Sequence, residues 1–145
     1  MLFRSREGEA RFRDIESEVL NDLSLNHSGV LSTGGGSVLR PENRQCLRER
    51  GRVFYLRSSP EEVFRRLRYD QNRPLLQVSD PMSRLRELFE TRDPVYKEAA
   101  HYVIETNRPS VSTLVNMIIR QLEQIGELPP GYKTPNLTPS MNMRS

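Results

Sequence analysis

Apolar and polar residues alternate along this chain with two different periods. Short runs of β-branched, aromatic and other apolar residues predict strands at 30–33, 53–56 and 102–104. Between and around them, apolar residues recur three or four positions apart, which predicts helices over 13–25, 41–50, 60–69, from 80 to 92, 93–100 and 110–125. Strands separated by helices predict an α/β fold with a mainly parallel sheet flanked by helices. Three strands are few for such a sheet.

Local signals set the ends of several helices. Ser59 is followed three residues later by Glu62, as in a capping box, and Ser110 is placed to cap the last helix. Glycines end the helix at 41–50 and the last helix, and Pro94 is expected to break the chain between two helices. The predicted inward faces are, in the first helix, Ile15, Val19 and Leu23; after Pro81, Met82, Leu85, Leu88 and Phe89; and in the last helix, Val111, Leu114, Val115, Ile118, Ile119, Leu122 and Ile125.

Composition limits the chain to one domain. Its 145 residues are 35% hydrophobic and 28% charged, which suits a single core. We expect this domain to occupy residues 1–126 and a flexible tail, rich in Pro, Ser, Thr and Asn, to occupy 127–145. Cys46 is the only cysteine, which excludes an intramolecular disulfide, and it is expected on the buried face of a helix. Charges near the start and the lack of a long apolar run predict a cytoplasmic protein without a membrane partner.

The basic residues are almost all arginine. Of 22 Lys and Arg residues, 20 are Arg, and the net charge is +3. Genomic base composition alone could produce this bias; the alternative is recognition of carboxylates or phosphates by the planar guanidinium. Acidic residues are interspersed, as in the helix with Arg84, Arg86, Glu87 and Glu90. That pattern is typical of solvated helix faces and argues against nucleic-acid binding.

Four segments carry candidate chemistry. The glycines Gly34, Gly35 and Gly36 follow a predicted strand, where a ligand could approach the backbone. Arg13 and Glu16 share a helix face, so the carboxylate could hold the guanidinium in place. The remaining two are Arg73, in a loop before Pro74, and Arg92, at the predicted end of a helix. Taken singly, each segment is more often structural than functional.

In this order, however, the segments resemble the shikimate kinase family, a P-loop kinase family with the nucleoside-monophosphate-kinase-like fold. The resemblance extends from about Phe3 to Leu122. It rests on Gly-Glu-x-x-Phe-Arg-x-x-Glu at 8–16, the triple glycine after 31–33, Arg-Pro-Leu-Leu at 73–76, Arg-x-Pro-x-Tyr-x-x-x-Ala at 92–100, and 106–111 before the last helix.

The resemblance implies ATP-dependent phosphorylation of the 3-hydroxyl of shikimate, on the route to chorismate and the aromatic amino acids, by a monomer that binds Mg²⁺. It implies that Arg13 and Arg92 bind the shikimate carboxylate, that Glu16 orients Arg13, and that Gly34, Gly35 and Gly36 place backbone against the ring. Arg73 would close over ATP as a catalytic lid residue. Arg108 and Arg66 would lie beside the adenine.

Two features depart from the family pattern. Arg11 stands where the family usually has glycine, and it could either alter the approach of this segment or point outward. No glycine in the chain is followed by lysine, so the pattern G-x-x-x-x-G-K-[ST], which cradles the phosphates, is absent.

We therefore expect an incomplete P-loop kinase fold that lacks the first strand, the P-loop and the metal ligands, and a chain that is inactive by itself. Two alternatives follow: a non-catalytic, degenerate kinase that still binds shikimate, or a kinase for another acceptor such as gluconate. The paired carboxylate-binding arginines argue against an acceptor that has no carboxylate.

Overall fold

The computed structural model describes residues 6–68, 79–106 and 110–127, with the side chains from residue 8 onward. Its elements are α1 (Arg6–Asn26), α2 (Pro41–Arg50), β1 (Phe54–Arg57), α3 (Pro60–Leu67), α4 (Pro81–Ala99), β2 (Tyr102–Glu105) and α5 (Val111–Gln124). The tail expected at 127–145 and the loop that carries Arg73 lie outside the described residues, apart from Glu127.

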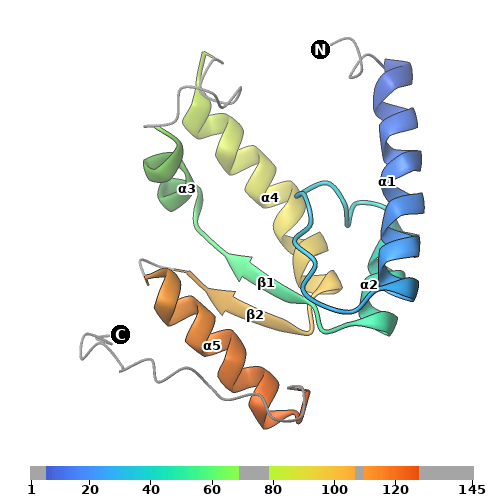
Figure 1. Cartoon of the computed structure of the whole chain (residues 1–145). Coiled ribbons are helices and arrows are strands. Elements are labelled where there is room, and N and C mark those ends of the chain that lie inside the picture. The colour runs from blue at the N-terminus through green and yellow to red at the C-terminus, as the bar shows by residue number, and fades with distance from the viewer. Residues whose placement is uncertain (1–5, 69–78, 107–109, 128–145) are drawn as a thin grey trace.

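The two strands pair in parallel, which confirms the predicted α/β class. Phe54 pairs with Tyr102 and Arg57 with Glu105. In Figure 1, α4 and α5 flank the strands on opposite sides, and α1 and α2 stand beside the end of α4 that leads into β2. Helix α2 packs against both α1 and α4, and α3 packs against α4.

The core lies where α1, α2 and α4 meet. Leu20, Val38, Leu47 and Ala99 are buried there, with Val53, Val95 and Tyr96 packed against them. On α1 the inward residue is Leu20, at 5% exposure, whereas Val19 is 48% exposed, so the prediction for Val19 was wrong by one position. A shift of one residue turns a helix by about 100°, because a turn takes 3.6 residues.

The helix ends agree with their sequence signals. The hydroxyls of Ser59 and Ser110 accept hydrogen bonds from the backbone N–H of Glu62 and Thr113, each at 3.2 Å. After α5, Gly126 takes a φ of 71°, a left-handed conformation that costs a residue without Cβ little.

Two predictions about regular structure fail. Residues 30–33 form no strand, and Val30 is fully exposed, because no described strand lies beside this segment to complete its hydrogen bonds. Pro94 lies inside α4 and does not break it. A proline removes one hydrogen bond from a helix, and here Asp93 contacts β1 on one side of that position and forms an ion pair with Lys97 on the other.

The apolar face of α5 is also less covered than its periodicity predicts. Val111 is 78% and Val115 40% exposed, and no residue of this helix is buried. Cys46 lies on α2 as expected but is half-buried, with its sulfur 3.1 Å from the Ser24 hydroxyl of α1. In the part of the chain that the structure describes, no helix is long and apolar enough to cross a membrane.

Candidate functional site

A turn of three glycines lies close to the ends of two guanidinium side chains. The N–H of Ser37 donates to the carbonyl of Gly34 at 3.1 Å, and the N–H of Leu39 donates to that of Gly36 at 3.2 Å. From the start of α2, Asn43 holds this segment through a buried hydrogen bond of 2.9 Å to the carbonyl of Ser37. The turn is therefore fixed to the core immediately beneath it.

The first guanidinium belongs to Arg13 of α1. Its Nη1 lies 2.8 Å from Glu16 Oε1, and its Nη2 lies 3.1 Å from Glu9 Oε1. The other oxygen of Glu16 accepts a hydrogen bond of 3.0 Å from the Ser37 hydroxyl. Glu16 thus links the arginine to the turn, as its predicted orienting role requires. Arg11, two residues earlier, is exposed on α1.

The absence of side chains in the turn makes room for this arrangement. A Cβ on Gly36 would lie 2.4 Å from Arg13 Nη2 and 2.6 Å from its Cζ. A Cβ on Gly35 would lie 2.8 Å from the Tyr96 hydroxyl and 3.3 Å from Arg92 Nη1. Neither glycine has a positive φ, so what requires glycine here is close approach and not an unusual backbone conformation.

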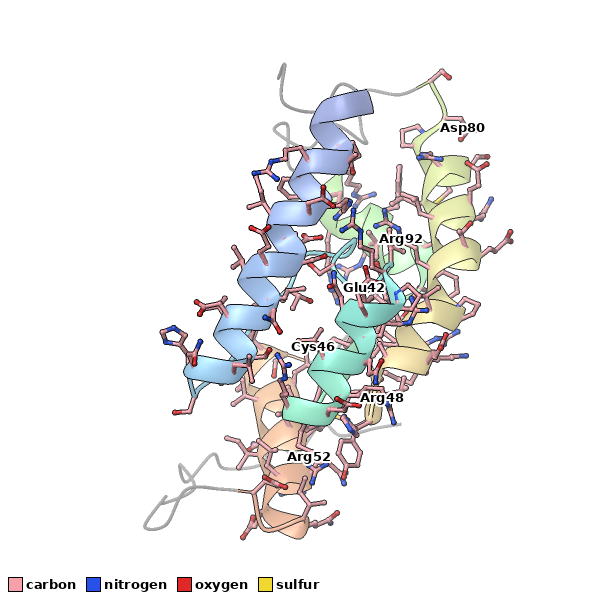
Figure 2. The ribbon with its side chains drawn as sticks, turned by 90° about the vertical axis from the view of Figure 1, so that its right-hand side faces the viewer. Glu42, Cys46, Arg48, Arg52, Asp80 and Arg92 are labelled. Atoms are coloured by element: carbon pink, nitrogen blue, oxygen red, sulfur yellow. The ribbon has the colours of Figure 1, made fainter. Side chains whose placement is uncertain are left out.

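The second guanidinium belongs to Arg92 of α4. Figure 2 shows this side chain extending from α4 toward α1. Arg92 approaches Gly35 and Arg13 approaches Gly36. The Cα atoms of these successive glycines are about 3.8 Å apart, so the two guanidinium groups approach neighbouring residues of one turn. Among the described residues, Arg92 forms no ion pair, which leaves its positive charge available to an anion. Two such groups can bind one carboxylate through several charge-assisted hydrogen bonds.

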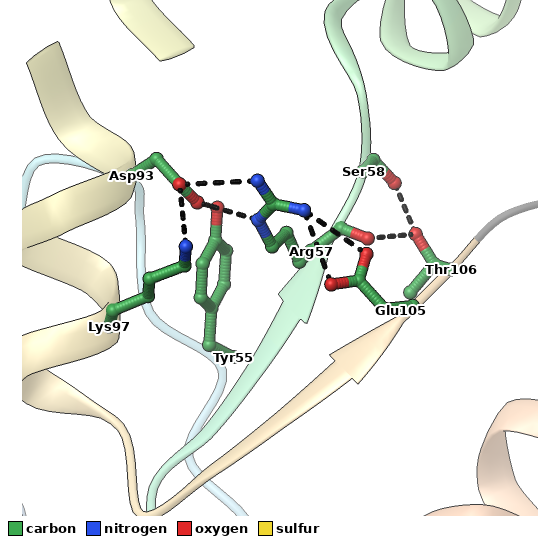
Figure 3. Close-up of polar contacts among 7 residues, drawn as sticks. All are labelled: Tyr55, Arg57, Ser58, Asp93, Lys97, Glu105 and Thr106. Atoms are coloured by element: carbon green, nitrogen blue, oxygen red, sulfur yellow. Dashed lines mark hydrogen bonds and ion pairs between the residues drawn. The ribbon is translucent and has the colours of Figure 1, made fainter. Parts of the chain in front are cut away.

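A second polar cluster supports the helix turn that carries Arg92 (Figure 3). Asp93 is only 8% exposed and accepts hydrogen bonds from Tyr55 at 2.7 Å and from Arg57 at 2.9 Å. Lys97 Nζ lies 3.3 Å from its other oxygen, and Arg57 also reaches Glu105 of β2. The carboxylate therefore fixes α4 to the end of β1 one residue away from Arg92.

Burial and hydrogen bonding shift the pKa values in this cluster in opposite directions. Burial alone would raise the pKa of Asp93, but hydrogen bonds from Arg57, Tyr55 and Lys97 outweigh it and lower the pKa below its ordinary value of 3.8. Burial and the hydrogen bond to Asp93 raise the pKa of Tyr55 well above 10.0. Asp93 is thus a carboxylate and Tyr55 a neutral donor throughout the physiological range.

Sequence reasoning missed this cluster and gave Tyr96 no role. The available signal was the spacing of Tyr55 and Arg57, which are two apart and lie on one face of β1, although Arg57 falls one residue beyond the predicted strand. An acidic residue next to a candidate ligand-binding arginine was the second signal.

Of the three arginines expected at the nucleotide, Arg73 and Arg108 lie outside the described residues. Arg66 of α3 donates to the carbonyl of buried Thr106 at 3.4 Å, just beyond the end of β2. The carboxyl ends of parallel strands are where α/β proteins bind nucleotides, so Arg66 fits a site next to one. Within residues 8–68, 79–106 and 110–127 no three His, Cys, Asp or Glu side chains are grouped to hold a metal ion.

Comparison with known proteins identifies the family of this site. The family model described as shikimate kinase matches residues 2–123. The chain belongs to the shikimate kinase family. It is 53% identical over 130 residues to the shikimate kinase of Ralstonia nicotianae, covering 89% of this chain and 68% of that protein. With the shikimate kinase of Burkholderia lata it is 58% identical over 120 residues, covering 83% and 65%. The chain thus spans about two thirds of the length of these curated shikimate kinases.

Solved shikimate kinase structures share this fold. The shikimate kinase of Acinetobacter baumannii, determined in complex with shikimate, superposes with a TM-score of 0.73 at 44% identity, covering 86% of this chain and 69% of that one. The shikimate kinase of Bacteroides thetaiotaomicron superposes with a TM-score of 0.69 at 30% identity, covering 83% and 70%. The resemblance inferred from the motifs is therefore confirmed.

Proposed function

We propose that this chain supplies the shikimate-binding part of a shikimate kinase, which transfers the γ-phosphate of ATP to the 3-hydroxyl of shikimate and yields shikimate 3-phosphate for chorismate synthesis. The observation that carries the proposal is the pair of guanidinium groups on one glycine turn. Shikimate carries one carboxylate, which Arg13 and Arg92 would bind from two helices. A relative solved in complex with shikimate supports the same ligand.

The site residues would divide the work of binding. Glu16 would keep Arg13 aimed at the carboxylate while Gly34, Gly35 and Gly36 let the ring approach the backbone. Arg66 would lie at the nucleotide, and Arg108 and the lid residue Arg73 would complete that side. Bound with Mg²⁺, ATP would supply the phosphoryl group. The residues described here would position and neutralise the acceptor.

We further propose that the 145-residue chain binds shikimate but transfers no phosphate, because its sequence lacks the phosphate-binding pattern G-x-x-x-x-G-K-[ST]. A non-catalytic shikimate-binding protein would behave in the same way, and this is the alternative function that the arginine pair also permits. A kinase acting on an uncharged acceptor would not use two arginines at this turn.

Two measurements on the purified chain test these proposals. A thermal melt with and without shikimate should show a cooperative transition that shikimate raises, because a ligand that binds the folded state stabilises it. Gluconate at the same concentration serves as the control anion. A coupled assay with MgATP should detect no shikimate-dependent ADP. A transition indifferent to shikimate would contradict the proposed binding, and shikimate-dependent turnover would contradict the proposed inactivity.

A further inference from the structure

Tyr96 connects the helix that carries Arg92 to the glycine turn. Its hydroxyl donates to the carbonyl of Gly35 at 2.8 Å. Its ring packs edge-on against the ring of Tyr55, with the centroids 5.1 Å apart, and the Tyr55 hydroxyl is held by Asp93. The Tyr96 side chain is therefore fixed at the ring by aromatic packing and at the hydroxyl by a hydrogen bond.

This hydrogen bond sets the plane of one peptide group. A trans peptide is planar, with its carbonyl and the following N–H pointing in opposite directions, and the described chain contains no cis peptide. Because the carbonyl of Gly35 points toward the hydroxyl on α4, the N–H of Gly36 must point away from it. Without such an anchor a peptide between two glycines could rotate, since neither residue has a Cβ to restrict it.

The hydrogen bonds of the turn's other backbone groups show which groups remain available to a ligand. The carbonyls of Gly34 and Gly36 accept from Ser37 and Leu39. In the part of the chain described, the N–H groups of Gly35 and Gly36 donate to no protein acceptor. A turn with filled acceptors and free donors, between two guanidinium groups, is suited to an anion or a hydroxylated ligand.

We propose that Tyr96 is a positioning residue, which orients the Gly35–Gly36 peptide so that the N–H of Gly36 donates to an oxygen of the bound acceptor. This inference rests on the proposed function, since the acceptor is shikimate. Tyr96 acts through the backbone and touches no reacting atom. The hydroxyl that anchors the peptide is on the same helix as Arg92, so the backbone donor and the cation keep a fixed relation to one another.

The test compares two substitutions that remove a single hydroxyl. Tyr96→Phe keeps the ring against Tyr55 but releases the Gly35 carbonyl. Tyr102→Phe is the matched control, because Tyr102 lies on β2 and contributes a stacked ring, 5.3 Å from that of Phe54, and no hydroxyl contact to the turn. Shikimate affinity is measured by calorimetry, the Gly35 carbonyl ¹³C resonance without ligand, and the Gly36 amide resonance during the shikimate titration.

Tyr96→Phe should weaken shikimate binding about fivefold, the effect of one lost hydrogen bond, while Tyr102→Phe matches the wild type. It should also shift the Gly35 carbonyl resonance in the free protein and reduce the response of the Gly36 amide to shikimate. Weaker binding with an unchanged Gly36 response would mean a general structural effect and overturn the inference. Wild-type affinity in Tyr96→Phe would overturn it and leave the proposed function intact. If the wild-type chain itself ignores shikimate, the proposed function fails and the inference fails with it.

Discussion

Gly36→Ala should abolish most ligand binding while leaving the fold intact. A Cβ at this position would lie 2.4 Å from Arg13 Nη2, where ordinary contact distance is about 3.5 Å. The guanidinium must therefore retreat by about 1 Å. It is the end of a flexible side chain that is 23% exposed, so it can move outward without disturbing the core.

The size of the effect follows from what a displacement of this length breaks. A charge-assisted hydrogen bond holds its atoms at about 2.7–2.9 Å, and about 1 Å of misplacement removes most of it. Such a bond contributes about 1.5–3 kcal/mol, which corresponds to roughly 10- to 150-fold in affinity. Stability should change by less than about 1 kcal/mol, because alanine is compatible with a φ that is not left-handed.

Calorimetric titration with shikimate and a urea melt measure the two effects on the same protein. Gly51→Ala is the control, because its Cβ would lie 3.6 Å from the Leu47 carbonyl, an ordinary contact at the end of α2. Gly34→Ala should weaken binding less than Gly36→Ala does, because its Cβ would meet only the Ser37 hydroxyl at 3.7 Å. Wild-type affinity in Gly36→Ala would refute the claim that this glycine makes room for a bound, correctly placed Arg13.

Three further substitutions test other contacts. Glu16→Asp keeps the charge but shortens the side chain, so Arg13 loses its fixed direction and shikimate affinity should fall about fivefold by calorimetry. Asp93→Asn removes a buried carboxylate with three donors and should lower the urea-derived unfolding free energy by about 2 kcal/mol. His101→Asn should flatten the pH dependence of stability: burial and then the charges of two nearby arginines lower the His101 pKa below 6.5, so the unfolded state binds more protons and stability falls as the pH drops through 6.5.

Each of these has a specific control and a contrary result. Glu18→Asp, on the exposed side of α1, should leave shikimate affinity unchanged. An equal loss of affinity in Glu16→Asp and Glu18→Asp would show that the substitutions act on the helix in general and not on the direction of Arg13. Glu105→Gln removes a carboxylate that is 55% exposed and should cost less than about 1 kcal/mol; a cost equal to that of Asp93→Asn would contradict the role of burial. Asparagine at 101 can still accept the Val53 N–H, so an unchanged pH slope would assign the slope to another group.

The sequence predicted those parts of the fold that depend on local chemistry. Serine caps, the glycine that ends the last helix and the two strands near 53–56 and 102–104 follow from short-range preferences, and the structure has them. Residues 30–33 have strand composition but form no strand, because pairing depends on a neighbour that composition does not reveal. Pro94 was expected to break a helix that contacts from another element hold together.

The sequence likewise predicted one part of the candidate site and missed another. Motif spacing selected Arg13, Glu16, the glycine turn and Arg92, and the structure brings them together. Motif spacing gave no indication that the Tyr96 hydroxyl reaches the Gly35 carbonyl, a contact between residues 61 apart. Such tertiary contacts depend on how α4 crosses the turn, which periodicity within one helix does not specify.

The parallel pairing of β1 and β2 has a consequence for the order of folding. Partners such as Arg57 and Glu105 are 48 residues apart, so pairing must close a long loop, whereas each helix can form from its own residues. Arg92 lies within that loop and Arg13 lies before it in the chain, and Asp93 joins α4 to the end of β1. The capacity to capture a carboxylate should therefore appear with the last kinetic phase of refolding, after most of the helical signal has already formed.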